Sequence, residues 1–180
     1  MTLLKSTGAN FIALAVMMLA GAFSAQAETS KKDVQIASRA VSFMTNAPTG
    51  AVTAAVVYDP ANAASKADAD AIVAAIGGGL KAGKATLTAK LVSTDSLGDL
   101  AGAKVVFIAE DTASQHAAIF SASSAQSILV ISTDMSCVDA GNCIVGVASK
   151  PKVEIVVSKA ARAAAGIDFK PAFLMMVKEK

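Results

Sequence analysis

The sequence predicts an α/β fold: a three-layer α/β/α sandwich around a mostly parallel sheet with an antiparallel hairpin near the C-terminus. Three observations lead to this prediction. Short apolar runs alternate with amphipathic segments, a pattern typical of a parallel sheet covered by helices. The chain has 180 residues, which suits one domain preceded by a leader. Two apolar runs, 144–148 and 153–157, are separated by a short turn and indicate the hairpin.

Residues 1–27 are expected to be a signal peptide, removed before the protein acts. Lys5 supplies a basic charge, residues 11–23 form a short apolar run, and residues 25–27 (AQA) match a small-x-small cleavage site. The apolar run is shorter than the roughly 20 residues that span a bilayer comfortably. An uncleaved membrane anchor is the alternative. The expected mature protein is therefore a single exported domain of residues 28–180, in a compartment that permits disulfides.

The first predicted helix, 33–44, carries more apolar surface than one contact with a sheet requires. Its apolar arc is wider than the roughly 100° stripe of a core-facing helix. The margin of this arc, near Val41 and Met44, either packs on the C-terminal helix around Phe173 or stays exposed. An exposed apolar margin would mark a protein-binding or dimer surface. The candidate residues of this partner helix are Arg39, Val41 and Met44.

The remaining strands and helices follow from the same two patterns. Apolar or alternating runs predict strands over 51–58, 85–92, 104–109 and 127–132. Two spacings match the capping box and predict the starts of two helices: Ser65 with Asp68, and Thr112 with Gln115. A short alanine-rich helix is expected after Ser158, and the apolar face of residues 169–177 predicts a last helix.

The composition excludes several classes of function. A formal net charge of +2 provides no basic field for nucleic acid. His116 is the single histidine, so it is the one possible base of a Ser-His-Asp triad, and we expect it to pack against the sheet or at its margin. Residues 78–85 (GGLKAGKA) nearly match a phosphate-binding loop, but they end a helix instead of following a strand. We expect no catalytic residue, no metal and no cofactor.

Cys137 and Cys143 are expected to form a disulfide, the default for a cysteine pair in an oxidising compartment. They flank turn-forming residues, so the bond would stiffen the loop after the strand 127–132. A metal site with His116 or Asp139 is the alternative, although the spacing matches no zinc signature. A redox-responsive bond would require strain or exposure.

Polar side chains follow several of the predicted strands. Because the carboxyl ends of parallel strands meet at one edge, Asp59, Glu110 and Asp111 are expected near the loop that follows 127–132. The alternative is that these groups cap loops and face solvent. The candidate ligand or partner loop comprises Ser132, Thr133, Asp134, Ser136 and Asp139.

Several features of the second half occur in a recognisable order. A strand ends in Ser-Thr-Asp (132–134), a glycine precedes the next apolar strand (141–144), and the second hairpin strand ends at Ser158. An Ala-Ala pair (160–161) and an Ala-Gly-Ile sequence (165–167) follow. This order resembles the YfiR-like family of bacterial periplasmic proteins. In this chain, Asn-Ala-Pro (46–48) stands where the family usually has an aromatic segment after the first helix.

The resemblance implies a non-enzymatic periplasmic protein that acts in cyclic-di-GMP signalling. It would control an inner-membrane signalling protein, typically a diguanylate cyclase, by binding its periplasmic part. The partner is expected to be that protein or a second copy of this chain, with no nucleic acid and no membrane insertion after cleavage. A small-molecule ligand is possible, since the layout also resembles one lobe of a solute-binding protein. A small solute-binding module is the alternative function.

Overall fold

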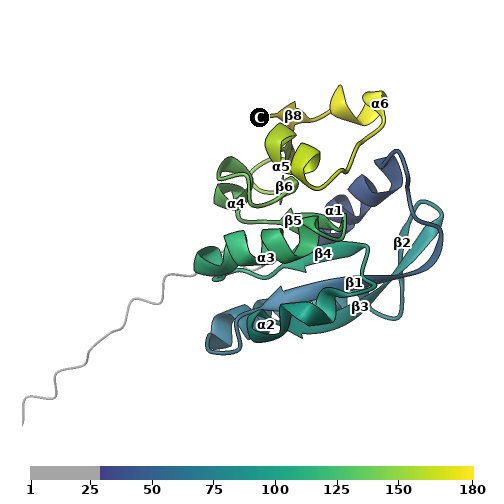
Figure 1. Ribbon diagram of the computed structural model, residues 1–180. Helices are drawn as coiled ribbons and strands as arrows, with labels where there is room; N and C mark the ends of the chain where they lie inside the picture. Colours follow the sequence, from purple (N-terminus) through teal and green to yellow (C-terminus); the bar gives the residue numbers. More distant parts are fainter. Residues whose placement is uncertain (1–28) are drawn as a thin grey trace, which may run out of the picture.

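The computed structural model describes residues 29–180 (Figure 1), so the predicted signal peptide lies outside the described residues. Within them, eight strands form one sheet in the order β2-β3-β1-β4-β5-β6-β7-β8. The strands are β1 Gly50–Tyr58, β2 Leu80–Ala82, β3 Ala85–Ser93, β4 Val105–Ile108, β5 Leu129–Ser132, β6 Val145–Ala148, β7 Glu154–Val157 and β8 Lys178–Glu179. The neighbours from β3 to β6 are parallel, whereas β2 with β3 and β6 with β7 are antiparallel.

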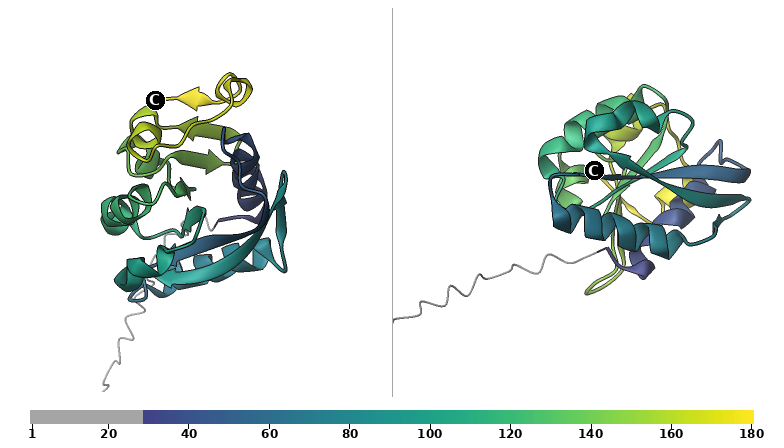
Figure 2. Two further views of the ribbon diagram at one scale, coloured as in Figure 1. Left: turned by 45° about the vertical axis from the view of Figure 1, so that its right-hand side comes forward. Right: turned by 90° about the horizontal axis from the view of Figure 1, so that it is seen from below.

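Helices cover both faces of this sheet, as the right-hand view of Figure 2 shows. The helices are α1 Lys31–Phe43, α2 Ala63–Ile76, α3 His116–Ser124, α4 Met135–Asp139, α5 Lys159–Ala164 and α6 Pro171–Leu174, with 3-10 turns η1 Thr94–Leu100 and η2 Ala113–Gln115. Side chains of α1, α2, α5 and α6 share one core cluster, and those of η1, α3 and α4 share the other. The predicted three-layer α/β/α sandwich and its antiparallel hairpin are confirmed.

The central strand β1 explains why the apolar run in its sequence is unbroken. Ala54 and Val56 belong to the core on one face, and Ala55 and Val57 belong to the core on the other. All four side chains are fully buried. A strand with helices on both faces needs apolar residues at every position, and β1 meets this requirement.

Both predicted capping boxes are wrong. The cap of α2 is Asn62, whose side chain accepts hydrogen bonds from the amides of Ala64 and Ser65. Asp68 lies inside this helix and is used in tertiary contacts instead. At the second site, the Thr112 hydroxyl donates to the carbonyl of Ala109, so it caps no helical amide.

The C-terminal segment differs from its prediction. The expected long helix is limited to α6, because the chain then extends and pairs with β7 as the parallel strand β8. The short strand β2 was not predicted. It forms a tight antiparallel pair with β3 around Gly83, whose φ of 65° is in the left-handed region that glycine tolerates.

The wide apolar arc of α1 packs against other parts of the same domain. Val41 is fully buried and Met44 is half-buried, whereas Arg39 is exposed. The Phe43 ring stacks on that of Phe173 with centroids 5.0 Å apart. The margin of the helix therefore packs against the C-terminal segment, and Val41 offers no surface to a partner. Within residues 29–180, no helix combines the length and apolarity that crossing a membrane requires.

Candidate functional site

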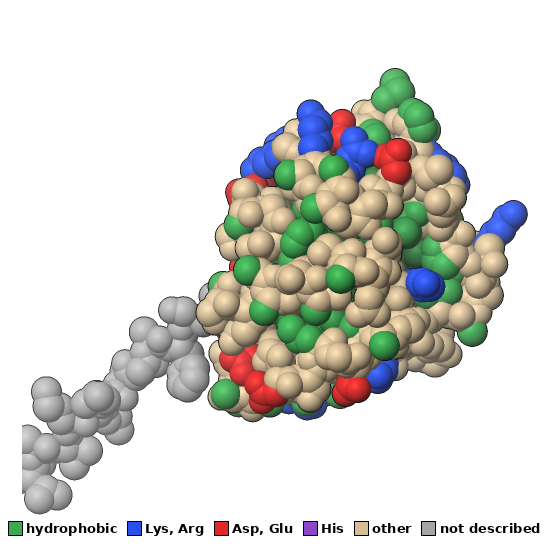
Figure 3. Space-filling model, viewed as in Figure 1, with side chains coloured by type: hydrophobic (Ala, Val, Ile, Leu, Met, Phe, Trp, Pro, Cys, Tyr) green, Lys and Arg blue, Asp and Glu red, His purple; other side chains and the backbone are tan. Residues whose placement is uncertain are grey.

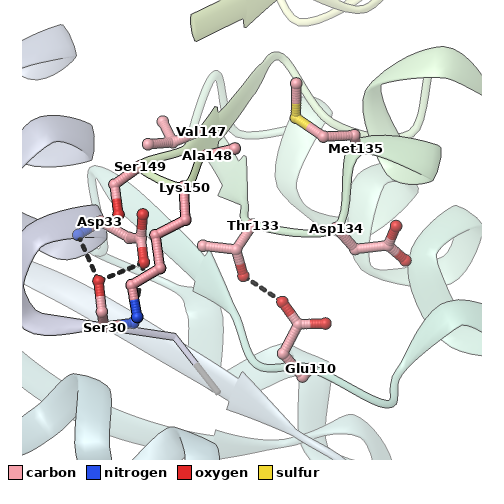
Figure 4. Close-up of a pocket in the computed structure, with 10 residues that line it drawn as sticks. All are labelled: Ser30, Asp33, Glu110, Thr133, Asp134, Met135, Val147, Ala148, Ser149 and Lys150. Atoms are coloured by element: carbon pink, nitrogen blue, oxygen red, sulfur yellow. Dashed lines mark hydrogen bonds between the residues drawn. The ribbon is translucent and has the colours of Figure 1, made fainter. Parts of the chain in front are cut away.

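A polar pocket of about 330 Å³ lies at the carboxyl ends of β4, β5 and β6 (Figure 4). Its polar walls come from the start of α1, from the residues after β4 and β5, and from the turn after β6. An apolar side is contributed by α4 and β6. The lining residues are Ser30, Asp33, Glu110, Thr133, Asp134, Met135, Val147, Ala148, Ser149 and Lys150.

Asp68 holds three parts of the fold together beneath this pocket. It is 3% exposed, and it reaches from α2 toward the segment before α1. Its Oδ1 accepts the backbone N–H of Thr29 at 2.6 Å, and its Oδ2 accepts the Thr29 hydroxyl and the Glu110 N–H, each at 2.9 Å. The chain before α1 and the end of β4 are therefore fixed to α2 by one buried carboxylate.

A chain of hydroxyl groups connects Asp68 to Glu110. The Thr29 hydroxyl donates to Asp68 and lies 3.0 Å from the Thr133 hydroxyl, which is hydrogen-bonded to the Glu110 carboxyl group. If Glu110 is ionised, Thr133 donates to it and no proton remains for the contact between the two threonines. If Glu110 is protonated, it donates to Thr133, which then donates to Thr29, and every contact has its proton. A proton on Glu110 therefore completes this chain of hydrogen bonds, whereas an ionised Glu110 leaves the contact between the two threonines without one.

Electrostatics act on Glu110 in the same direction. Burial raises the pKa of its carboxyl group, and the nearby carboxylates of Asp68, Asp134 and Asp111 raise it further. The hydrogen bond with Thr133 opposes this but does not cancel it. Glu110 therefore takes up a proton more readily than an ordinary glutamate does.

Asp33 lies on the opposite wall and behaves differently. It forms a true capping box with Ser30, in which the Ser30 N–H donates to Asp33 Oδ2 at 2.9 Å and the Asp33 N–H donates to Ser30 Oγ at 3.2 Å. Burial raises the pKa of Asp33, but donors from Ser30 and Ser149 outweigh it, and the net shift is downward. Asp33 Oδ1 is buried, and among residues 29–180 no donor is oriented to form a hydrogen bond with it, although Ser149 lies beside it.

His116 supports no catalytic assignment. It is 4% exposed at the start of α3, and burial lowers its pKa against the opposing influence of Asp134. The Asp134 side chain caps α4 by accepting the Ser136 N–H at 2.9 Å. Among residues 29–180, no group of three His, Cys, Asp or Glu side chains is arranged to hold a metal ion.

The predicted ligand loop is divided between two environments. Thr133 and Asp134 line the pocket together with Glu110, and Ser132 is buried beneath them. Ser136 and Asp139 are exposed and do not line it. Asp59, also expected at this edge, accepts the Ala61 N–H and the Gln115 side-chain amide outside the pocket.

Sequence reasoning missed the second wall of the pocket, formed by Ser30, Asp33, Ser149 and Lys150. One signal was present, because Ser30 precedes Asp33 by the three residues of a capping box, and it also marks the true start of α1. The spacing of Ser65 and Asp68 predicts a helix cap for Asp68, whereas the structure uses this carboxylate in tertiary hydrogen bonds. Its partner Thr29 carries no local signal, since the two residues are 39 positions apart.

The predicted disulfide is confirmed. Cys137 in α4 is bonded to Cys143, with their Cα atoms 5.3 Å apart. Both residues have 0% exposure and belong to the core between the sheet, α3 and α4. The bond uses both thiols, which rules out the alternative metal site while it is intact. Its burial favours a structural role over a redox-responsive one, because reductants reach exposed bonds more easily.

These features define an α/β domain with a polar pocket at the carboxyl edge of its sheet. The sequence pattern of the YfiR/HmsC-like family matches residues 60–178, and the chain belongs to this family. Membership supports, in general terms, a regulatory role in the periplasm, without identifying a partner. A comparison with curated proteins found no match.

Solved structures share the fold at low sequence identity. An ABC domain from Streptococcus pneumonia in complex with L-Trp aligns with a TM-score of 0.59 and 13% identity, covering 82% of this chain and 60% of that one. A conserved domain protein from Vibrio cholerae O1 biovar eltor aligns with a TM-score of 0.59 and 14% identity over 83% and 59%. A ligand-free, open substrate binding protein with adhesive properties from Clostridium difficile aligns at 0.56 and 15% over 72% and 54%. This chain thus spans little more than half of each.

Proposed function

We propose that this protein is a non-enzymatic periplasmic regulator that binds and controls an inner-membrane signalling protein, such as a diguanylate cyclase, through the periplasmic part of that protein. Membership in the YfiR/HmsC-like family carries the proposal. The described residues support a binding role more than a catalytic one. The one histidine is buried with a lowered pKa, and the carboxylates of the pocket are engaged by amides and hydroxyls.

A surface suited to a protein partner lies at the C-terminal segment. Met175 and Met176, directly after α6, are 87% and 66% exposed. Figure 3 shows hydrophobic side chains protruding from the end of the molecule that carries α6. Methionine side chains are flexible and polarisable, and exposed apolar groups of this kind often mark protein contacts. This surface replaces the α1 margin as the candidate partner site.

The regulator is tested by crosslinking in cells. A photoreactive amino acid at Met176 is expected to capture an inner-membrane protein with a cytoplasmic signalling domain, identified by mass spectrometry. The same residue at Asp70, an exposed position on α2, provides the control. Deleting the gene is expected to change the cellular level of cyclic di-GMP. Capture of no membrane protein, together with an unchanged nucleotide level, would refute the proposal.

Solute binding is the second candidate function, and the polar pocket is the observation that favours it. Open α/β sheets bind ligands beyond the carboxyl ends of their strands, where this pocket lies. Its volume of about 330 Å³ is within the range of small-molecule sites. A bound solute would stabilise the folded protein by RT ln(1 + [L]/Kd), so the melting temperature would rise with the concentration of the solute.

A further inference from the structure

The last strand of the sheet has an open edge. β8 ends the strand order, so its backbone has a neighbouring strand, β7, on one side alone. The Lys180 N–H donates to the Val157 carbonyl at 2.9 Å, so the backbone groups of Lys180 point toward β7. Because successive residues of a strand point these groups to opposite sides, those of Val177 and Glu179 point away from the sheet. Figures 1 and 2 show β8 at the outermost end of the sheet, where such a row of groups can pair with another chain.

Exposed apolar side chains lie beside this edge. The large apolar side chains that are exposed among residues 29–180 are Leu91, Val153, Met175 and Met176. Met175 and Met176 directly precede the strand segment, and Val153 directly precedes β7. The register pairs Val156 with Lys178, and continuing it by two residues places Met176 level with Glu154, the neighbour of Val153. Three of these four side chains therefore lie at one end of the sheet.

This end of the molecule is also its basic part. Residues 150–180 contain seven lysines and arginines and three aspartates and glutamates, whereas residues 29–149 contain eight and ten. Ion pairs use three of the seven cations, and four exposed lysines form none within the described part of the chain: Lys150, Lys152, Lys159 and Lys170. Lys178 chiefly, and Lys152 and Lys180 more weakly, lower the pKa of Glu154, which places Lys152 near the open edge. The edge therefore carries positive charge that its own carboxylates do not balance.

We propose that the open edge of β8 binds an extended, acidic segment of the partner protein, which adds to the sheet as a further strand beside β8. The outward backbone groups of Val177 and Glu179 pair with the backbone of this segment. The unpaired lysines attract its carboxylates, and the exposed methionines contact its apolar side chains. The inference rests on the proposed regulator and names the kind of segment that the regulator recognises.

A second copy of this chain suits the same edge less well. Residues that lie opposite one another in an antiparallel pair share a face of the sheet. In a pair of two β8 strands centred on each other, Lys178 of one copy therefore lies opposite Lys180 of the other. Like charges in this position destabilise a sheet, whereas an acidic segment places carboxylates there. An anionic membrane surface also attracts lysines, but it offers no row of backbone groups to the strand.

The test uses the full-length protein in cells, with the photoreactive residue at Met176 to capture the partner. Val177→Pro removes the outward N–H, and Val177→Ala, which shortens the same side chain but keeps that N–H, is the matched control. The yield of crosslinked membrane protein should be at least about fivefold lower in Val177→Pro than in Val177→Ala, as the loss of one hydrogen bond predicts. Mass spectrometry should place the crosslink in a segment of the partner that contains aspartate or glutamate.

A second pair of variants tests the charge of the segment. Lys152→Glu should lower the crosslinking yield at least about threefold, because it replaces an attraction with a repulsion. Lys84→Glu is the control, since Lys84 is an exposed lysine in the turn between β2 and β3, at the opposite end of the strand order. It should leave the yield unchanged.

The inference is overturned if the two Val177 variants give the same yield, or if Lys152→Glu and Lys84→Glu do. If Val177→Pro does not fold, the two lysine variants decide. Self-crosslinks in place of the membrane protein would assign the edge to a second copy. Binding of the purified protein to phosphatidylglycerol vesicles that Lys152→Glu abolishes and Val177→Pro does not would assign it to lipid, and either result overturns the inference. A cyclic-di-GMP level that changes on gene deletion, without any crosslink from Met176, would refute this edge alone. Crosslinks that respond as expected, with an unchanged nucleotide level, would refute the control of a diguanylate cyclase alone.

Discussion

The carboxylates at the carboxyl edge of the sheet and those of the C-terminal region are stabilised by different kinds of partner. At the carboxyl edge of the sheet, Asp68 and Asp33 accept hydrogen bonds from backbone amides and hydroxyls. Neither forms an ion pair with a lysine or arginine among the described residues. In the C-terminal region each carboxylate has one: Arg162 pairs with Asp168 and Glu179, Lys178 with Glu154, and Lys180 with Asp139. In the C-terminal region the carboxylates are therefore neutralised by ion pairs, whereas at the carboxyl edge of the sheet they are stabilised by amides and hydroxyls.

The pKa shifts follow this division. The hydrogen bond and charge of Lys178 hold the pKa of Glu154 below its usual value. Burial and neighbouring carboxylates raise the pKa of Glu110 above it. Two glutamates of one small domain are therefore shifted in opposite directions by their surroundings.

The largest expected effect is the loss of the buried carboxylate beneath the pocket. Asp68→Ala leaves the N–H groups of Thr29 and Glu110 and one hydroxyl without their acceptor. The free energy of unfolding should fall by about 3 kcal/mol, because unsatisfied buried donors are costly. Chemical denaturation at neutral pH measures this. Asp70→Ala, an exposed residue of the same helix, is the matched control. An equal loss in both variants would contradict the comparison.

The disulfide lies between the two regions, since α4 begins beside Asp134 at the pocket and ends at Asp139, which binds Lys180. Replacing both Cys137 and Cys143 with serine should lower the free energy of unfolding by about 2 kcal/mol, as expected for a short closed loop. Chemical denaturation of the oxidised wild type and of the variant gives the difference. Crosslinking from Met176 should persist if the bond is structural. Loss of the crosslink with an unchanged stability would instead indicate a regulatory bond.

Glu110→Gln should stabilise the protein at neutral pH, because it removes a repelled, partly buried charge. We expect a gain of up to about 1 kcal/mol, given that one pKa unit corresponds to about 1.4 kcal/mol and that solvent screens part of it. The folded wild type binds this proton more tightly than the unfolded chain, so lowering the pH through the raised pKa stabilises the wild type. The advantage of the variant should therefore vanish below the ordinary pKa of glutamate.

Glu154→Gln should change the free energy of unfolding at neutral pH in the opposite direction, as a loss and not a gain, in the same experiment. The pKa of Glu154 is lowered in the folded state, so its contribution to stability is present above the ordinary pKa of glutamate and is lost as the pH falls through the lowered one. Denaturation curves across acidic pH compare the two variants with the wild type. Parallel pH profiles for Glu110→Gln and Glu154→Gln would show that the two regions do not differ electrostatically.

Six of the eight strands in the described part of the chain could be predicted because each carries its pattern locally. The apolar run of β1 and the paired runs of β6 and β7 lie close to their predicted bounds. Helix starts were harder, since Ser65 and Asp68 match a capping box while Asn62, three residues earlier, is the cap that the chain uses. The strand β8 has no pattern of its own, and its pairing with β7 depends on tertiary packing.

Half of the pocket could be predicted for the same reason. The rule that parallel strands end at one edge brought Glu110, Thr133 and Asp134 together. The other wall depends on where the start of α1 lies across the sheet, which places Asp33 opposite Glu110. No short-range pattern encodes this, because it depends on the order of the strands and on the packing of α1 against β6.

The smallest expected effect is at the ion pair between Lys180 and Asp139, whose side chains are both 53% exposed. Lys180→Ala should cost less than about 1 kcal/mol, because water already solvates both charges and ordering two long side chains offsets the attraction. The backbone remains attached, since the Lys180 N–H donates to the Val157 carbonyl at 2.9 Å whatever the side chain. Chemical denaturation in low and high salt should show this small cost shrinking as salt screens the pair. Lys66→Ala, which breaks the exposed pair on α2, is the control. A loss as large as that of Asp68→Ala would mean that the surface pairs anchor the chain end as strongly as the buried carboxylate anchors the pocket.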